Sequence, residues 1–140
     1  MEIDKSLIDS LFEQAESSPR RRMNYDLRTS PADTSQRMLN ALLPGTQVPI
    51  HQHAETAETV ICLMGRLDEI IYEEVASYSS EYTSMVQDVV RGVAYREASR
   101  IHLDPASGQF GCQIPMGTWH TIEVFEPSVI FEAKDGAYKG

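Results

Sequence analysis

Three of the four histidines in this chain fall in a pattern that could hold a metal ion. His51 and His53 lie two residues apart in "HQHAETAE", so on a strand both imidazoles would point the same way, about 6.5 Å apart along the chain. Glu58 opens the next apolar run, and a strand that returns antiparallel would bring its carboxylate to the same point. His120 follows a Pro-x-Gly turn far downstream, in "PMGTWHTIEV". Imidazole and carboxylate ligands without a thiolate suit Fe(II), Mn(II), Ni(II), Zn(II) or Cu(II).

Four such ligands would leave about one to three coordination positions open, which is typical of a catalytic rather than a closed structural metal centre. The competing interpretation is that these are ordinary polar residues on surface strands and turns. A single His-x-His pair would favour that interpretation. The spacing of all four residues together favours one divalent metal ion per chain.

The spacing of these residues resembles the two signature motifs of the cupin superfamily. Gly45-x5-His51-x-His53-x4-Glu58-x6-Gly65 matches the first motif, and Pro115-x-Gly117-x2-His120 matches the second. The order of "PRRRMN", "QRMLNALLPGT" and "IPMGTWHTIEVFEPSVIFEAKDGAY" is similar to that in the WbuC-type cupin metalloproteins, which are associated with bacterial surface-polysaccharide gene clusters. This resemblance spans residues 19–138 and implies a double-stranded β-helix, or jelly-roll barrel, with one divalent metal ion inside. The ligands it implies are His51, His53, Glu58 and His120.

The rest of the chain is predicted to be one helix followed by β-structure. Apolar residues recur at helical spacing from Ile3 to Ala15, which predicts an amphipathic helix over residues 4–16, and "SSPRRR" ends it. "LRTSPADTS" is expected to be a loop. Short β-type runs separated by Gly and Pro follow, namely "QRMLNALL", "TQVPIHQH", "ETVICLM", "RLDEIIYEE", "ASRIHLD", "QFGCQI", "HTIEVF" and "SVIFEA". They favour an all-β fold with an N-terminal helix at 1–18 and a β-barrel domain at 19–140.

One segment does not follow this pattern of short β-type runs. Apolar residues between positions 81 and 96 recur at helical spacing, namely Met85, Val86, Val89, Val90 and Val93. Valine is a mediocre helix former. We therefore expect either a short helix or an irregular excursion between strands here.

The alternation of strand residues predicts the wall around the metal ion. Cys62 and Met64 share a face with Glu58, and Ile122 shares a face with His120. Cys62, Met64 and Ile122 are therefore expected to line a mostly apolar substrate cavity, although residues of these types more often serve simply as core packing.

The charge balance of the chain limits its partners. With 12 Lys and Arg against 21 Asp and Glu, the net charge is −9, so no nucleic-acid partner is expected. The basic run "PRRRMN" supplies Arg20 and Arg22 as candidate ligands for an anionic substrate; the plainer interpretation is a solvated stretch after a helix. No apolar run suits a membrane span and the N-terminus lacks the features of a signal peptide, so no membrane partner and a cytoplasmic location are expected.

Two further residues are predicted to face away from the metal ion. His102 alternates with the apolar Ile101 and Leu103, which favours a position in water. Trp119 points away from the side that His120 faces, so it needs cover, as does the apolar stripe of the helix. A second subunit would supply that cover, and cupins commonly pair, so we expect a homodimer.

Three kinds of function remain open at this point. The first is a metal-dependent enzyme (an isomerase, hydrolase, lyase or dioxygenase) acting on a small polar or anionic molecule such as a carbohydrate derivative. The second is a non-catalytic, metal-dependent binding or sensor protein on the same fold. In the third, the ion only holds the fold together. Open coordination positions favour the first two.

Overall fold

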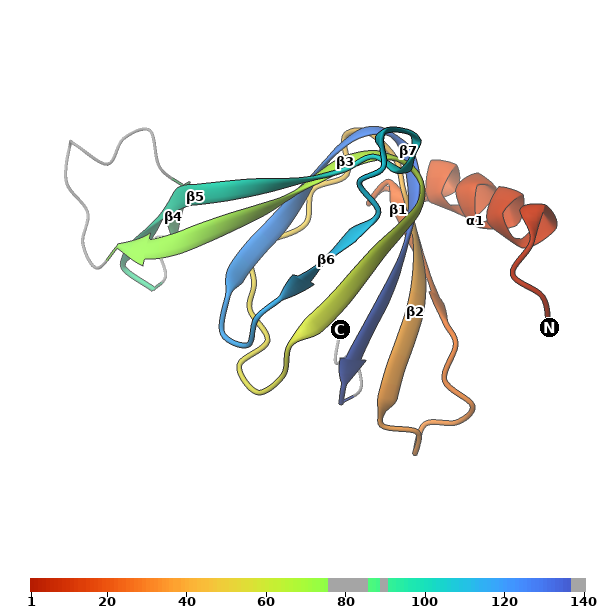
Figure 1. Ribbon diagram of the computed structural model, residues 1–140, viewed down its shortest axis with the longest axis horizontal. Helices are drawn as coiled ribbons and strands as arrows, with labels where there is room; N and C mark the ends of the chain where they lie inside the picture. Colours follow the sequence, from red (N-terminus) through yellow and green to blue (C-terminus); the bar gives the residue numbers. More distant parts are fainter. Residues whose placement is uncertain (76–85, 89–90, 137–140) are drawn as a thin grey trace.

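The computed structural model of the protein describes residues 1–75, 86–88 and 91–136. One helix and seven strands make up this part of the chain (Figure 1). Their bounds are α1 Lys5–Ser17, β1 Arg22–Asp26, β2 Ser35–Leu42, β3 Glu58–Val75, β4 Val86–Asp88, β5 Val93–Leu103, β6 Gly111–Ile114 and β7 Trp119–Asp135, with a short 3-10 helix at Pro105–Ser107. No helix among the described residues has the length and apolar character needed to cross a membrane.

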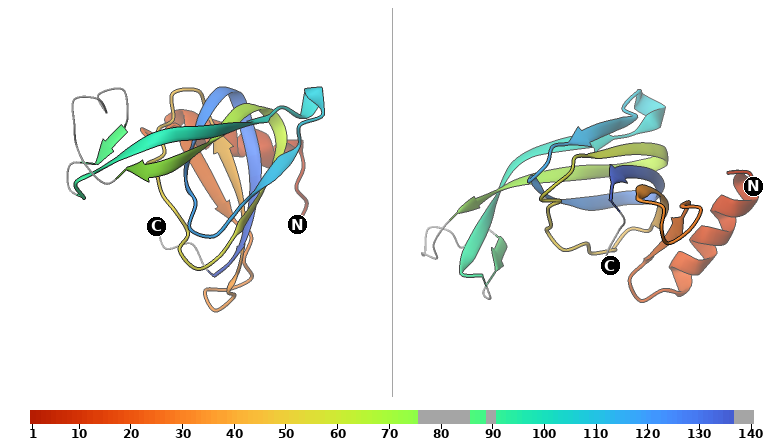
Figure 2. Two further views of the ribbon diagram at one scale, coloured as in Figure 1. Left: turned by 60° about the vertical axis from the view of Figure 1, so that its left-hand side comes forward. Right: turned by 90° about the horizontal axis from the view of Figure 1, so that it is seen from below.

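The strands form one antiparallel sheet in the order β1-β2-β7-β3-β5-β4, and β6 pairs with the N-terminal part of β3. The expected all-β class with a short N-terminal helix is confirmed. The expected barrel is not closed, because the outer strands β1 and β4 have no pairing with each other in the described part of the chain. The result is a strongly bent open sheet, in which the ends of β3 and β5 extend away from the side that carries α1 (Figures 1 and 2).

The sheet bends where the two longest strands lose their register. Pairing between β3 and β7 shifts three times between Cys62 and Leu67. Gly65 has a φ of +98°, and a Cβ atom on it would lie 2.2 Å from Ser128 Oγ and 2.4 Å from the Pro127 carbonyl oxygen, so only glycine fits. Pro127 itself has no N–H to give to the ladder. Consequently "ETVICLM" and "RLDEIIYEE" form one bent strand rather than two, and so do "HTIEVF" and "SVIFEA".

Two hydrophobic clusters stabilise this arrangement. The inner cluster lies within the bend of the sheet and contains Leu42, Val60, Cys62, Leu67, Leu103, Ile114, Val124 and Ile130. The outer cluster joins α1 to the far side of β2 and β7 and contains Leu11, Ala15, Leu39, Ala41, Leu43 and Val129. At about 25 cal/mol per Å² of buried apolar surface, each cluster is a major source of folding free energy.

The predicted helix is confirmed, shifted by one residue. Asp4 caps it by accepting a hydrogen bond from the Leu7 amide at 3.0 Å, and Ser18 and Pro19 end it. Leu11 and Ala15 of its apolar stripe are buried against the sheet of the same chain, whereas Ile3 is 52% exposed. Trp119 is half-buried, with the Tyr95 ring 5.2 Å from it and the Arg91 guanidinium 4.7 Å above it. The same chain thus supplies part of the cover for which a second subunit was expected, and the homodimer stays a prediction.

Three local predictions differ from the structure. β1 was not expected, and it pairs along β2 at the edge of the sheet. "TQVPIHQH" contains a single bridge residue, His51, rather than a strand. Within residues 81–96, positions 81–85, 89 and 90 lie outside the described residues, but 86–88 and 93–96 are strand, so the helix is wrong there. The β-branched Val86 and Val93 favour extended backbone, which explains the error.

Candidate metal centre

The histidine cluster is built where a loop closes onto the start of β7. His51 and His120 exchange both backbone hydrogen bonds, with N–O distances of 3.0 and 2.9 Å, as a residue pair in an antiparallel ladder does. The carbonyl of His53 accepts a hydrogen bond of 2.8 Å from the amide of Gly117, whose φ of +76° suits glycine. These backbone contacts hold His51 and His53 next to His120, although neither lies in a continuous strand.

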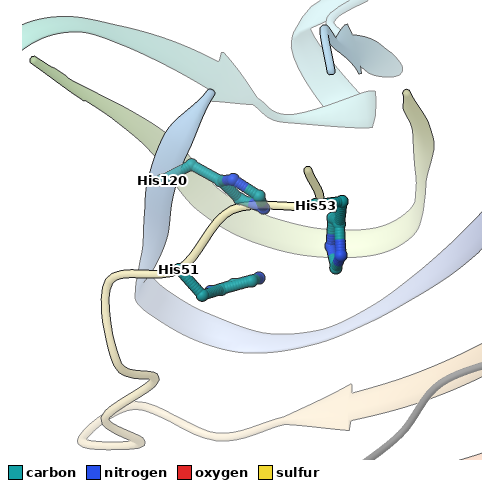
Figure 3. A group of neighbouring side chains, drawn as sticks. All are labelled: His51, His53 and His120. Carbon is teal, nitrogen blue, oxygen red and sulfur yellow. The ribbon is translucent and has the colours of Figure 1, made fainter. Parts of the chain in front are cut away.

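The three imidazoles converge on one another. Their candidate ligand nitrogens all lie within 4.8 Å of one another. The ring of His120 lies 4.2 Å from that of His51 and 5.6 Å from that of His53, centroid to centroid. Figure 3 shows the three side chains facing a common space, His120 from β7 and the other two from the loop.

Hydrogen bonds fix the orientation of two of these rings. His51 Nδ1 lies 2.9 Å from the carbonyl oxygen of Pro49, and His120 Nδ1 lies 3.0 Å from that of Thr118. A carbonyl can only accept, so Nδ1 carries the proton in each neutral ring and leaves Nε2 with a free lone pair. Metal-binding histidines are held in this way in proteins generally.

Glu58, the first residue of β3, lies beside this cluster, although its carboxylate is not among the ligand atoms that converge within 4.8 Å. Its Oε2 lies 2.8 Å from His53 Nε2, and the residue is only 5% exposed. Apart from this ion-pair contact, the buried His53 Nε2 has no hydrogen-bond partner among the described residues. An imidazole nitrogen and a carboxylate oxygen held this close, beside two further imidazoles, can bind one cation together. The residues present therefore fit a divalent metal ion.

Burial sets the protonation of the cluster. It lowers the pKa of His51, and with the charge of His51 it lowers the pKa of His120 to about 4. Burial also acts to raise the pKa of Glu58, but His53 and the other two histidines outweigh it, and that pKa is lowered. At neutral pH His51 and His120 are thus unprotonated imidazoles and Glu58 is a carboxylate, the states in which these groups bind metal ions.

A cavity of about 930 Å³ opens beside the cluster. Of the predicted substrate residues, Arg20, Arg22 and Ile122 line it. Cys62 lies in the inner cluster, where burial raises the pKa of its thiol to about 11, and Met64 is 43% exposed; neither lines the cavity. Simple alternation along the strand fails for Met64 because the bulge at Gly65 follows directly.

The cavity wall is mixed, whereas alternation predicted a mostly apolar one. Among the polar residues that line it without having been predicted for the site are Gln36, Asn40, Glu69 and Glu132. Their only trace in the sequence is polar residues at inward positions of apolar strands, such as Gln36 and Asn40 around Met38 in "QRMLN". Burial, with the charge of Glu58, raises the pKa of Glu132 to about 8, and burial also raises that of Glu69 well above its ordinary value.

Comparison with solved structures shows that the chain has a cupin-like fold. Residues of the chain superpose on TT1209 from Thermus thermophilus with a TM-score of 0.58 and 19% identity, covering 97% of this chain and 98% of that one. KdgF from Halomonas sp. gives 0.57 at 14% identity, covering 87% and 84%. The Schizosaccharomyces pombe Cnp3 cupin domain gives 0.55 at 8% identity, covering 84% and 66%. At these identities the similarity shows the cupin fold alone.

The family is defined by sequence. A family model described as "Domain of unknown function (DUF6016)" matches residues 3–83, which is more than half of the chain, so the protein belongs to that family. No curated protein sequence matches the chain. The protein is therefore a cupin-fold member of the DUF6016 family with a candidate metal centre of three histidines.

Proposed function

We propose that this protein is a metal-dependent cupin enzyme, of the WbuC type, that acts on a small polar or anionic molecule held in the cavity. The observation that carries the proposal is the convergence of His51, His53 and His120 beside a cavity wide enough for a small ligand. These three residues and Glu58 would hold one divalent ion. When bound there, the ion would polarise an oxygen of the substrate or activate a small ligand such as water.

The chain's own residues support an enzymatic role. Glu132 lines the same cavity and its raised pKa of about 8 lets its carboxyl exchange a proton near neutral pH. Arg20 also lines the cavity and is exposed to solvent there, where it can attract an anionic group. A cavity with an acid-base group, a cation and an adjoining metal centre is arranged for chemistry on a charged or polar substrate.

The proposal is tested first by metal content. Protein purified without added metal is expected to contain close to one equivalent of a divalent metal ion by elemental analysis, and the variant H51A/H53A is expected to contain almost none. The control is H102A, which removes a histidine outside the cluster. Absence of metal from the wild type, also after incubation with Fe(II), Mn(II), Ni(II), Zn(II) and Cu(II), would refute the metal centre.

Turnover separates the enzyme from a sensor. Small hydroxylated and carboxylated molecules are incubated with metal-loaded protein, and products are followed by mass spectrometry against E132Q as the acid-base control. Binding that raises the melting temperature without any product would favour a non-catalytic sensor instead.

A further inference from the structure

We propose that the inner wall of the cavity is a subsite for the hydroxyl groups of a polyhydroxylated ligand, and that Gln36, Asn40 and Glu69 accept hydrogen bonds from them. The inference rests on the proposed function, because this ligand is the small molecule that would reach the metal centre. It adds the substrate class and names residues outside the metal ligands.

The strand register places these residues around one space. Gln36 and Asn40 lie on β2 on either side of Met38, which pairs with Glu132 on β7. Glu132 pairs in turn with Val60 on β3, and Glu69 lies farther along β3, opposite Ile122. Polar side chains from three neighbouring strands thus line the same cavity as the histidine cluster.

One oxygen atom of each of these three side chains has no hydrogen-bond donor beside it. Gln36 Oε1, Asn40 Oδ1 and Glu69 Oε2 are buried and have no hydrogen-bond partner among the described residues. Gln36 and Glu69 are only 3% and 2% exposed. Buried acceptors are normally satisfied in native proteins, so three of them along one cavity indicate a group that brings donors. Hydroxyl groups are such donors.

The charges around the wall favour neutral donors over an ammonium group. Lys134 lines the same cavity, and its ammonium group donates to the carbonyl oxygen of Gly136 at 2.8 Å. Arg20 and Arg22 line it as well. Burial favours the protonated form of Glu69 and Glu132, which reduces the negative charge that a cationic ligand would need.

A second metal ion is a poorer occupant of this wall. Among the described residues, the histidine cluster is the one group of three or more imidazole, thiol or carboxylate ligands whose atoms converge. The carboxylates of Glu69 and Glu132 do not form such a group with a third ligand from that part of the chain. A polyol can bridge acceptors that are spread along a wall, whereas a single ion cannot.

The test measures binding of three polyols to the metal-loaded protein by calorimetry: D-gluconate, myo-inositol and sorbitol. Hexanoate, which has the carbon chain and carboxylate of gluconate but no hydroxyl groups, is the matched probe. We expect gluconate to bind at least tenfold more tightly than hexanoate. The variants Q36M and N40L are each expected to weaken gluconate about threefold to tenfold, the effect of one lost hydrogen bond.

Q36M should also change the stability of the protein, and in the opposite direction. Replacing a buried unsatisfied acceptor by an apolar group of similar size is expected to raise the unfolding midpoint of the ligand-free protein, while metal content stays unchanged. The control Q113M removes an exposed glutamine on β6, outside the cavity, and is expected to alter neither binding nor metal content.

Several results would overturn the subsite. These are equal binding of hexanoate and gluconate, unchanged gluconate affinity in Q36M and N40L, tighter binding of 1,6-diaminohexane than of any polyol, or no polyol binding at millimolar concentration. Gluconate binding that persists in protein without metal and still depends on Gln36 and Asn40 would support the subsite and refute the metal centre. The two proposals therefore fail separately.

Discussion

Two regions of the molecule place a histidine against a carboxylate, and they differ in what surrounds the pair. In the histidine cluster, His53 Nε2 lies 2.8 Å from Glu58 Oε2, and the pair is largely buried. On the outer face of the sheet, His102 Nδ1 lies 2.6 Å from Asp68 Oδ1, and the His102 side chain is 63% exposed. Distance alone would rank the outer pair as the tighter contact.

The partners of the outer pair explain why it is not a metal site. Arg100 lies 3.3 Å from Asp68 and 2.6 Å from Glu123, and it also contacts Glu97. We call these five residues, Asp68, Glu97, Arg100, His102 and Glu123, the outer network. Its carboxylates already contact Arg100 or His102, whereas the buried His53 Nε2 of the histidine cluster has no hydrogen-bond partner among the described residues. Metal-binding capacity thus follows from unused lone pairs that converge, and not from the proximity of an acid to an imidazole.

The largest effect on metal binding is expected when a candidate metal ligand of the histidine cluster is replaced. His120→Ala should fold, because its backbone bridge to His51 needs no side chain, and should bind divalent metal at least about tenfold more weakly, as ligand-environment losses do elsewhere. It should also release metal at a higher pH than the wild type, since protons compete for the remaining ligands. Competition with a chromophoric chelator across pH 5 to 8 measures both. His102→Ala is the matched control, and equal retention by His120→Ala and wild type would remove His120 from the ligand set.

Two glutamates of β7 lie in different surroundings, Glu132 in the cavity and Glu123 in the outer network. The pKa of Glu132 is raised, so the folded protein keeps a proton that the unfolded chain has released. Stability from this group is therefore full below its ordinary pKa near 4.5 and is lost as the pH rises through about 8. We expect metal-free wild type to lose on the order of 1–2 kcal/mol between pH 5 and 9 from this group, allowing for its partial contact with the cavity.

Urea unfolding of metal-free protein at several pH values tests this expectation. Glu132→Gln cannot ionise, so its stability should fall less steeply toward pH 9 than that of the wild type. Glu123→Gln, which breaks an exposed ion pair, should shift stability by no more than about 1 kcal/mol, with no such pH profile. Parallel slopes for Glu132→Gln and wild type between pH 5 and 8 would show that Glu132 is ionised in the folded protein throughout that range.

Replacing each of the two arginines beside the cavity, Arg20 and Arg22, should affect a different kind of binding. Arg22 donates to the Gln47 carbonyl at 2.9 Å and to Thr46 Oγ1 at 3.3 Å, in the loop that leads to His51. Arg22→Ala should therefore weaken metal binding about threefold to tenfold by loosening that loop. Arg20→Ala should leave metal binding unchanged and weaken the binding of inorganic phosphate. Chelator competition and phosphate titration distinguish them, and identical behaviour of the two variants would contradict these separate roles.

The smallest effect is expected in the outer network. Arg100→Ala removes ion pairs with the exposed Glu97 and Glu123 and with the buried Asp68, which keeps His102 as a partner. It should therefore cost about 1 kcal/mol at low salt and less in 1 M NaCl, where the exposed pairs are screened. Urea unfolding at both salt concentrations measures this, with metal content unchanged. A loss of metal in Arg100→Ala would mean that the outer network and the histidine cluster are coupled rather than independent.

Much of the candidate site could be predicted because its residues are tied to local backbone features. His51, His53 and Glu58 fall within eight positions of one another, and a Gly117 turn sets His120. The helix could be predicted equally well, since the spacing of its apolar residues and its end at Pro19 are local features of the sequence. The exposure of His102 followed from strand alternation alone.

The features that escaped prediction depend on long-range pairing. Gly65 looks like a turn in the sequence, but here it allows a bulge opposite Pro127, far along the chain. The inward direction of Gln36 and Glu69 becomes visible only once β2 and β3 are registered on β7. Without that register, polar residues on strands are expected on the solvent side.

Trp119 is the single tryptophan of the chain and the direct neighbour of His120. Its ring is half-buried against Tyr95 and Arg91. Its fluorescence is therefore a spectroscopic reporter already built into the protein, one residue from the centre. A paramagnetic ion such as Cu(II) should quench the emission on entering the cluster, whereas Zn(II) should leave its intensity nearly intact. Occupancy can thus be followed in real time without any label.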